Sequence, residues 1–246
     1  MLASIKRLVS RAAASRGIEL RKVPRTLLQN WQARLGVDLR MVVALQESKH
    51  PEITFVQIGA YDGVSGDALH ELIGPNWRGI FVEPQPSAFV KLKQRYGEDY
   101  RFTLANVAIG DRDEVRNLYA IDTRDGNLPP WAEQVASFRR DVLESQVAHI
   151  PDIKQRILTI PVECVTLATL LKRSNIEKLD LLQLDTEGYD GVIVRSIDFQ
   201  THRPAIIRYE HKHLDHAERD QTISKLISAG YKVAVEYEDT IAFCAG

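Results

Sequence analysis

The stretch that decides the fold is ITFVQIGAYDGVSGDAL, residues 53–69. It begins with an apolar run, ITFVQI, that has the length of a buried strand. Three glycines follow at Gly59, Gly63 and Gly66, and a helix is expected to begin near Asp67. A strand, a glycine-rich turn and a helix in this order are typical of a site for a nucleotide-like ligand.

The residues of the turn favour a cationic ligand over a phosphate. No G-K-[ST] follows, which excludes a P-loop, and the G-x-G-x-x-G fingerprint is absent because Ala60 and Tyr61 follow Gly59. The carboxylate of Asp62 would repel a phosphate at a helix N-terminus. S-adenosylmethionine carries an amino group and a sulfonium and no phosphate. We therefore expect this cofactor, with Gly59, Ala60, Tyr61, Asp62 and Gly63 around its methionine end.

The rest of the chain predicts an α/β fold with a mostly parallel sheet. After ITFVQI, short apolar runs alternate with amphipathic helices: GIFVEP, FTLANVAI, LDLLQL, AIIRYE, YKVAVEYE and IAFCAG. Strands spaced in this way form βαβ units and a sheet that is buried on both faces. Only a short turn joins the last two runs, so they are expected to form an antiparallel hairpin.

Two further strand ends supply candidate contacts to the cofactor. Glu83 ends the second strand, and its carboxylate can accept two hydrogen bonds from a ribose diol. NAD has such a diol too, so an NAD-dependent oxidoreductase of a nucleotide-like substrate stays an alternative. Asn106 follows the third strand, where its amide can address an adenine edge. Pro84 and Ala108 are assigned to the same site.

The candidate catalytic residues lie after the fourth and fifth strands. Asp185 and Glu187 follow LDLLQL, and Glu210 and His211 end RPAIIRYEH. Neighbouring strands present their ends to one crevice, so these groups are expected to meet. One carboxylate, Asp185 among them, could bind the cofactor's amino group, and another carboxylate or His211 could deprotonate an acceptor. A divalent metal held by the same four residues is an alternative that we do not favour.

The string HKHLDH, residues 211–216, also matches the H-x-H-x-D-H motif of metallo-β-lactamase-type hydrolases. Those enzymes need further metal-binding histidines downstream, and no histidine follows His216. They also carry the motif early in a differently ordered fold. We therefore interpret the match as accidental.

Five blocks, in this order, resemble the FkbM-type methyltransferases: VQIGAYDG, FVEP, ANVAIGD, LDLLQLDTEGYD and RPAIIRYEHKHL. The resemblance runs from about Phe55 to Phe243. It implies a class I methyltransferase (Rossmann-like) with a seven-stranded sheet and an antiparallel C-terminal hairpin. It also implies S-adenosylmethionine-dependent methylation of a hydroxyl on a small molecule, sugar or glycolipid. Many members carry a lysine and an acidic residue where this chain has Gln183 and Gln57.

Two segments lie outside this pattern. Residues 1–50 are expected to form a helical appendage to the methyltransferase domain, residues 51–246. Residues 1–25 carry seven Lys or Arg and one acidic residue, and their apolar residues recur at helical spacing. Such a basic amphipathic segment suits an anionic membrane surface, a transit peptide or a helix that packs against the domain or a partner. Residues 122–158 begin with turn residues and continue as a helix. They are expected to form a lid or substrate wall, with Trp131 and Phe138 in its apolar part.

Composition narrows the range of partners. The net charge of −1 argues against a dedicated nucleic-acid binder. Two distant cysteines indicate no disulfide framework or zinc site, and no stretch is long and apolar enough for a signal or a membrane span. We expect a cytoplasmic enzyme, with peripheral membrane contact through its basic N-terminus. A non-catalytic interaction domain is the third alternative, against which Asp185 and Glu187 count.

Overall fold

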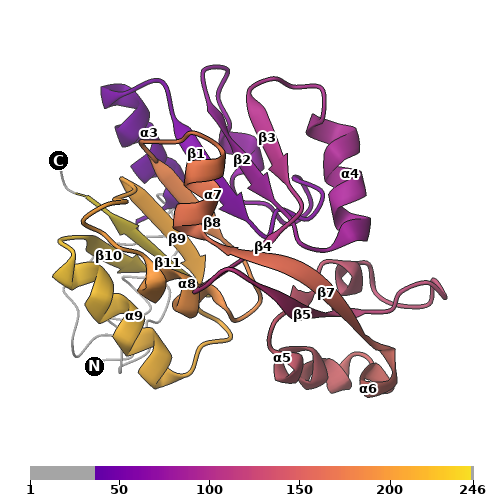
Figure 1. Cartoon of the computed structure of the whole chain (residues 1–246). Helices are drawn as coiled ribbons and strands as arrows, with labels where there is room; N and C mark the ends of the chain where they lie inside the picture. Colours follow the sequence, from indigo (N-terminus) through magenta and orange to yellow (C-terminus); the bar gives the residue numbers. More distant parts are fainter. Residues whose placement is uncertain (1–36, 245–246) are drawn as a thin grey trace, which may run out of the picture. The chain divides into compact units, whose positions relative to one another are not determined.

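A seven-stranded sheet forms the centre of the part that the structure describes (Figure 1). The computed structural model describes residues 37–244. The strand order is β10-β11-β9-β8-β1-β2-β3, with β11 antiparallel to both neighbours and all other pairs parallel. The strands are β1 (Thr54–Ile58), β2 (Arg78–Val82), β3 (Phe102–Ala105), β8 (Leu181–Leu184), β9 (Ile206–Glu210), β10 (Lys232–Val235) and β11 (Asp239–Phe243). This arrangement confirms the predicted α/β class, the mostly parallel sheet and its C-terminal hairpin.

Helices cover both faces of this sheet, because each central strand is apolar on both sides. Phe55 and Phe81 lie in one core cluster with residues of two helices, and Val56 and Ile58 lie in another with residues of three. The first pair of helices is α3 (Leu39–Lys49) and α4 (Pro86–Tyr96), and the second group is α7 (Leu167–Arg173), α8 (Asp190–Ser196) and α9 (His216–Ser228). A strand alternates its side chains between faces, so adjacent residues enter opposite cores.

Helix α3 lies in the region that we assigned from sequence to the appendage. Its Leu39, Val42 and Val43 are buried in the core cluster of Phe55, and the indole N–H of Trp77 donates a hydrogen bond of 2.6 Å to Glu47. Residues 1–36 and 245–246, with the basic helix expected in residues 1–25, lie outside the described residues. No helix among residues 37–244 is long and apolar enough to cross a membrane.

A second, four-stranded sheet was not visible in the sequence pattern. Its order is β4-β7-β5-β6, and β5 pairs antiparallel with β7 over the whole length of β5. The strands are β4 (Ala108–Gly110), β5 (Glu114–Ile121), β6 (Ala136–Ser137) and β7 (Ile157–Thr166). The run FTLANVAI therefore divides between two sheets, as β3 and β4. Figure 1 shows β5 and β7 running away from the main sheet towards two short helices.

The insertion at residues 122–158 is not the continuous helix that we expected. Its elements are η2 (Pro130–Glu133), β6, α5 (Arg140–Glu144), η3 (Ser145–Ala148) and α6 (Ile153–Arg156). Pro151 separates the last two helical turns, because proline donates no backbone hydrogen bond. Leu143, Ile150 and Ile153 bury their side chains in a small cluster of their own with Ile121.

The prediction of a helix beginning near Asp67 is also wrong. The only helical element between β1 and β2 is one 3₁₀ turn, η1 (His70–Leu72). The carboxylate of Asp67 accepts a hydrogen bond from the N–H of Leu69 at 2.7 Å, and Gly74 and Pro75 then end the turn. Asp62 therefore cannot repel a phosphate from a helix N-terminus, because no α-helix begins at this turn.

The carboxyl ends of β1 and β8 meet where the order of strands reverses. The register pairs Ile58 with both Val82 and Leu184, so the residues after these three strands share one edge of the sheet. Gly59 has φ +79°, and a Cβ added to it would lie 1.8 Å from the carbonyl oxygen of Asp185. Only glycine fits this position, and the reversal beside it is where open sheets of this class bind ligands.

Gly59→Ala tests this contact. We expect a loss of more than about 3 kcal/mol in the free energy of unfolding, because the methyl group meets backbone and the left-handed conformation is strained. Gly126→Ala is the matched control, since Gly126 has φ +70° and nothing within 4 Å of an added Cβ. It should lose about 1 kcal/mol. Equal losses in urea unfolding would show that the approach of the two strands does not constrain Gly59.

Candidate functional site

One pocket opens at this edge of the main sheet, and residues of the second sheet close its side. From the ends of the main strands it is lined by Gly59, Ala60, Tyr61, Glu83, Pro84, Asp185, Thr186, Glu187, Arg208, Glu210, Glu238 and Asp239. From the second sheet and the insertion come Ala108, Ile109, Leu118, Gln134, Ala136, Ser137 and Phe138. The pocket thus brings together most of the residues that the sequence singled out, although they come from five different strands and the loops between them.

The glycine turn contributes its first three residues to the lining. Asp62 and Gly63 are not among the lining residues. The carboxylate of Asp62 instead accepts hydrogen bonds from the N–H groups of Val64 and Ser65 and from the Ser65 hydroxyl. Burial acts to raise the pKa of Asp62, but these bonds outweigh it and lower the pKa. Asp62 therefore stabilises the turn.

Tyr61 connects the glycine turn to the insertion. Its φ of +47° is unusual for a residue with a side chain. The Tyr61 hydroxyl lies 2.9 Å from Oε2 of Glu133 in η2 and 3.0 Å from Nζ of Lys91 in α4, and the Lys91 ammonium pairs with Glu133. The cofactor turn and the insertion are thus joined by one small polar cluster.

Glu83 is the buried carboxylate of the cofactor half. Oε2 accepts the N–H of Tyr61 at 2.7 Å and Oε1 accepts the N–H of Gln85 at 2.8 Å. Burial raises the pKa of Glu83 to about 7, against the lowering effect of these two bonds. Each carboxylate oxygen keeps a further lone pair. Glu83 can therefore accept two more hydrogen bonds from a ligand in the pocket.

Asn106 is not among the residues that line the pocket. Its amide Nδ2 donates to the carbonyl oxygen of Glu83 at 2.8 Å and to that of Pro84 at 3.3 Å. It therefore fixes the chain that leaves β2, behind the lining. Pro84, Ala108 and Ile109 do line this end of the pocket, which gives it an apolar surface suited to a flat ring.

Three carboxylates converge in the opposite half of the pocket. Asp185 and Glu187 follow β8, and Glu210 ends β9. The Asp185 side chain is exposed to the interior of the pocket, but protein encloses that space. This desolvation and the charges of Glu187 and Asp190 raise the pKa of Asp185 well above its usual range. Desolvation and the charge of Asp185 likewise raise the pKa of Glu210 to about 9.

The histidine beside these carboxylates is His213 and not His211. Nε2 of His213 lies 2.9 Å from Oε2 of Glu187 and 3.7 Å from Oε2 of Glu210. His211 is 4% exposed and is not among the lining residues. Its Nδ1 shares a 2.9 Å hydrogen bond with the Thr240 hydroxyl, and burial lowers its pKa to about 4. The candidate histidine from the sequence was His211, so His213 is an addition from the structure.

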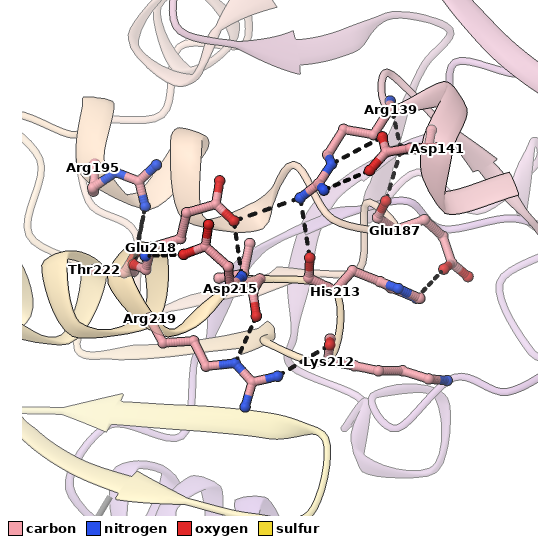
Figure 2. A network of polar contacts seen from close by, with 12 residues as sticks. Arg139, Asp141, Glu187, Arg195, Lys212, His213, Asp215, Glu218, Arg219 and Thr222 are labelled. Atoms are coloured by element: carbon pink, nitrogen blue, oxygen red, sulfur yellow. Dashed lines mark hydrogen bonds and ion pairs between the residues drawn. The ribbon is translucent and has the colours of Figure 1, made fainter. Parts of the chain in front are cut away.

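A polar network holds Glu187 and His213 in place (Figure 2). The Ser137 hydroxyl donates to the carbonyl oxygen of Glu187 at 2.7 Å and accepts the N–H of Arg139 at 2.9 Å. Nη1 of Arg139 donates to the carbonyl oxygen of His213 at 3.1 Å. Glu187 itself has φ +52°, a conformation that costs about 1–3 kcal/mol and persists only where its surroundings enforce it.

The pocket lining is rich in carboxyl groups. Seven carboxylates line it, those of Asp67, Glu83, Asp185, Glu187, Glu210, Glu238 and Asp239, against the guanidinium of Arg208. Nη2 of Arg208 pairs with Oδ2 of Asp239 at 2.5 Å. A cationic ligand favours the charged forms of these carboxyl groups, so the lining suits a sulfonium and an amino group better than the pyrophosphate of a dinucleotide.

The sequence analysis missed Arg208, Glu238 and Asp239. An arginine inside the apolar run AIIRYE was a usable signal, because a charge in a buried strand requires a partner. Phe138 lines the pocket as expected, whereas Trp131 is not among the lining residues and packs in the cluster of the insertion. The lining residues from the second sheet could not be found without knowing that this sheet exists.

The residues present fit S-adenosylmethionine. A backbone that only glycine can follow, at Gly59, leaves the cofactor turn close to Asp185. The free lone pairs of Glu83 suit a ribose diol, and the surface around Pro84 and Ala108 suits adenine. The acidic half suits the cationic groups of the methionine end.

Comparison with known proteins gives one family match and several structural likenesses. Residues 57–233 match the family described as Methyltransferase FkbM domain. The FkbM methyltransferase of Methylobacillus flagellatus KT is 14% identical with a TM-score of 0.49, covering 78% of this chain and 43% of that protein. This chain thus spans less than half the length of that protein. No curated protein matches the sequence.

Two other solved structures are similar at lower TM-scores. Precorrin-6y C5,15-methyltransferase of Geobacter metallireducens GS-15 is 12% identical with a TM-score of 0.41, covering 87% of this chain and 92% of that protein. Fibrillarin of Aeropyrum pernix, solved with natively bound S-adenosyl-L-methionine, is 10% identical with a TM-score of 0.38, covering 78% of this chain and 65% of that protein.

Glu83→Gln tests the contact to the ribose. A carboxylate accepts two diol hydrogen bonds better than a protonated acid does, so affinity should rise with pH through the Glu83 pKa of about 7. We expect wild type to bind S-adenosylhomocysteine about tenfold more tightly at pH 8 than at pH 6. Glu83→Gln should bind roughly 10- to 100-fold more weakly without this dependence. Calorimetric titration measures both, with the exposed Glu71→Gln as control.

His211→Gln tests whether His211 is structural. The folded-state pKa of about 4 lies below the unfolded value of about 6.5, so folding favours the neutral ring. Its contribution is complete above about pH 6.5 and is lost as pH falls towards 4. Urea unfolding should show wild type losing about 2 kcal/mol more than His211→Gln between pH 7 and pH 5. Identical losses would contradict the buried, neutral state of His211.

Proposed function

The chain belongs to the FkbM methyltransferase family, and from this premise we propose that it transfers a methyl group from S-adenosylmethionine to a hydroxyl oxygen. The proposed acceptor is a neutral small molecule, sugar or glycolipid. The observation that carries the proposal is the convergence of three carboxylates, Asp185, Glu187 and Glu210, beside the glycine turn. Such groups can accept a proton from a hydroxyl and orient its oxygen.

The cofactor half of the pocket is proposed to hold S-adenosylmethionine at two places. The turn from Gly59 to Tyr61 would hold its methionine end and Glu83 its ribose. When bound, the cofactor supplies a methyl group on a sulfonium, and the carbon–sulfur bond breaks with its electrons going to sulfur. The chain's own task is to align an acceptor oxygen with that methyl group and to exclude water.

Asp185 is the proposed proton acceptor. It directly follows the end of β8, in register with Gly59 after β1, so it lies between the cofactor turn and the other two carboxylates. The O–H proton of the acceptor would pass to the Asp185 carboxylate while the oxygen bonds to the methyl carbon. Glu187 and Glu210 would accept hydrogen bonds from further hydroxyls of the acceptor, which favours a polyhydroxylated molecule.

The charge and the walls of the pocket restrict the acceptor further. A phosphorylated or carboxylated acceptor would face the seven carboxylates of the lining, with Arg208 already paired to Asp239. Phe138 and Leu118 add apolar surface on the side of the second sheet. The acceptor that suits these walls is uncharged, with hydroxyls on one side and an apolar face on the other.

The site argues against the two alternatives from the sequence, an NAD-dependent oxidoreductase and a non-catalytic interaction domain. An NAD-dependent oxidoreductase does not agree with the methyltransferase family match or with a lining that suits cationic groups better than pyrophosphate. A non-catalytic interaction domain does not require carboxylates held in a pocket by strained backbone, as Glu187 is.

A methyl label identifies the atom that is methylated. The protein is incubated with S-adenosylmethionine carrying a ¹³C methyl group and with neutral polyols, glycosides and glycolipids. The expected product signal is that of a methoxy carbon. The proposal for oxygen would be overturned by any acceptor that is methylated at nitrogen, sulfur or carbon and is turned over faster than these hydroxyl compounds.

Asp185→Asn tests the proton acceptor. We expect kcat to fall by about 10²- to 10⁴-fold, because an amide cannot take the proton. The affinity for S-adenosylhomocysteine should change by less than about tenfold, since the amide keeps the volume of the side chain. Glu163→Gln, which breaks an exposed ion pair with Arg173 outside the pocket, is the control and should keep its activity. An unchanged kcat in Asp185→Asn would remove Asp185 from this role.

A further inference from the structure

We propose that Glu187, Glu210 and His213 form a binding site for a divalent transition-metal ion at the acceptor end of the pocket. Each offers one ligand atom, and these three atoms lie within 4.8 Å of one another. The role of the ion, to bind and activate the acceptor hydroxyl, rests on the proposed function; the site itself does not.

The geometry of the three side chains is close to that of a metal site. Two ligands at right angles, each about 2.1 Å from an ion, are about 3 Å apart. Nε2 of His213 and Oε2 of Glu187 are 2.9 Å apart, and Oε2 of Glu210 is 3.7 Å from the same nitrogen. A small rotation of the Glu210 side chain would bring all three atoms to one ion.

The charges at the site call for a cation. Among residues 37–244, neither Glu187 nor Glu210 has an ion pair with a lysine or arginine. Oε2 of Glu210 is fully buried and has no hydrogen-bond partner among these residues, although a buried carboxylate oxygen normally has one. The carboxyl group of Asp185 lines the same pocket. One divalent ion would offset the repulsion between these carboxylates and coordinate the unpartnered oxygen of Glu210.

The backbone that carries His213 is held rigidly, as a metal ligand requires. Arg139 donates to the carbonyl oxygen of His213, and Arg219 donates to those of Lys212 and Leu214 at 3.1 and 2.9 Å. Figure 2 shows both arginines reaching this loop from different sides. The following helix α9 begins with a capping box between Asp215 and Glu218.

The backbone of Glu187 is likewise supported, on the other side of the site. The Ser137 hydroxyl donates to its carbonyl oxygen, its backbone has the strained φ of +52°, and its carboxylate lies 2.9 Å from Nε2 of His213. Strain of this kind is found where a side chain must be held for a ligand. An accidental contact between two side chains would require neither a strained backbone at Glu187 nor the hydrogen bond from Ser137.

The ligand set indicates the class of metal and its use. Imidazole with two carboxylates suits Mn²⁺, Fe²⁺ or Zn²⁺ better than Mg²⁺, which prefers oxygen ligands alone. Three protein ligands leave coordination positions open, as catalytic sites do. An acceptor hydroxyl in an open position becomes more acidic, and its proton can pass to Asp185. The ion changes no oxidation state in this step.

Direct metal binding tests the site without any acceptor. The full chain is treated with a chelator, dialysed and titrated with Mn²⁺, and free Mn²⁺ is measured by electron paramagnetic resonance. We expect one Mn²⁺ per chain, displaced by Zn²⁺ and bound more tightly than Mg²⁺. Glu187→Gln, Glu210→Gln and His213→Gln should each weaken binding by at least about tenfold. Circular dichroism checks that each variant is folded.

Two variants serve as matched controls. His211→Gln removes a histidine two residues from His213, and Glu238→Gln removes a carboxylate from the same lining but outside the three-residue site. Both should bind Mn²⁺ within about threefold of wild type. No binding by wild type, or binding that His213→Gln leaves unchanged, would overturn the proposal. Binding lost equally in Glu238→Gln would also overturn it, because the pocket would then attract Mn²⁺ by charge alone.

The metal proposal and the proposed function fail in different experiments. Hydroxyl methylation that persists unchanged in chelator, without Mn²⁺ binding, removes the metal and leaves the O-methyltransferase in place. One bound Mn²⁺ with methylation at nitrogen or carbon keeps the metal site and removes the proposed acceptor.

Discussion

The close approach of β1 and β8 at their carboxyl ends is the constraint on which the rest of the site depends. The carbonyl oxygen of Asp185 occupies the space where any side chain at residue 59 would begin. This contact makes the chain turn at Gly59 with a positive φ, and it brings the cofactor turn and the residue after β8 into one crevice. The α/β order of strands supplies the crevice, and the missing Cβ lets its two walls meet.

Electrostatics then separates the pocket into two halves. Glu83 is stabilised by two backbone N–H groups, so its carboxylate is fixed before any ligand arrives. Asp185, Glu187 and Glu210 accept no backbone N–H among residues 37–244, and burial together with their mutual repulsion raises the pKa of both Asp185 and Glu210. The first half therefore presents a prepared hydrogen-bond acceptor, whereas the second presents three carboxyl groups whose charged forms a cation or a set of hydroxyl groups can stabilise.

The second sheet connects these halves physically. Its strand β4 continues from β3 of the main sheet, and Ser137 and Phe138 at the end of β6 reach the pocket. Ser137 and Arg139 also hold the Glu187 and His213 backbones. The insertion at residues 122–158 thus supports candidate acceptor-binding groups and also contacts the cofactor turn, through Glu133 and Tyr61.

The sequence by itself determined the seven main strands, the hairpin and the positions of Gly59, Glu83, Asp185 and Glu210, because strand ends follow from apolar runs and chain order. It could not determine β5 and β7, whose pairing is antiparallel across the insertion and leaves one face partly solvated. It also could not choose between two histidines two residues apart. The tertiary structure decided this. The Thr240 hydroxyl of β11 shares a hydrogen bond with Nδ1 of the buried His211, whereas His213, in the loop after β9, has its Nε2 2.9 Å from Oε2 of Glu187.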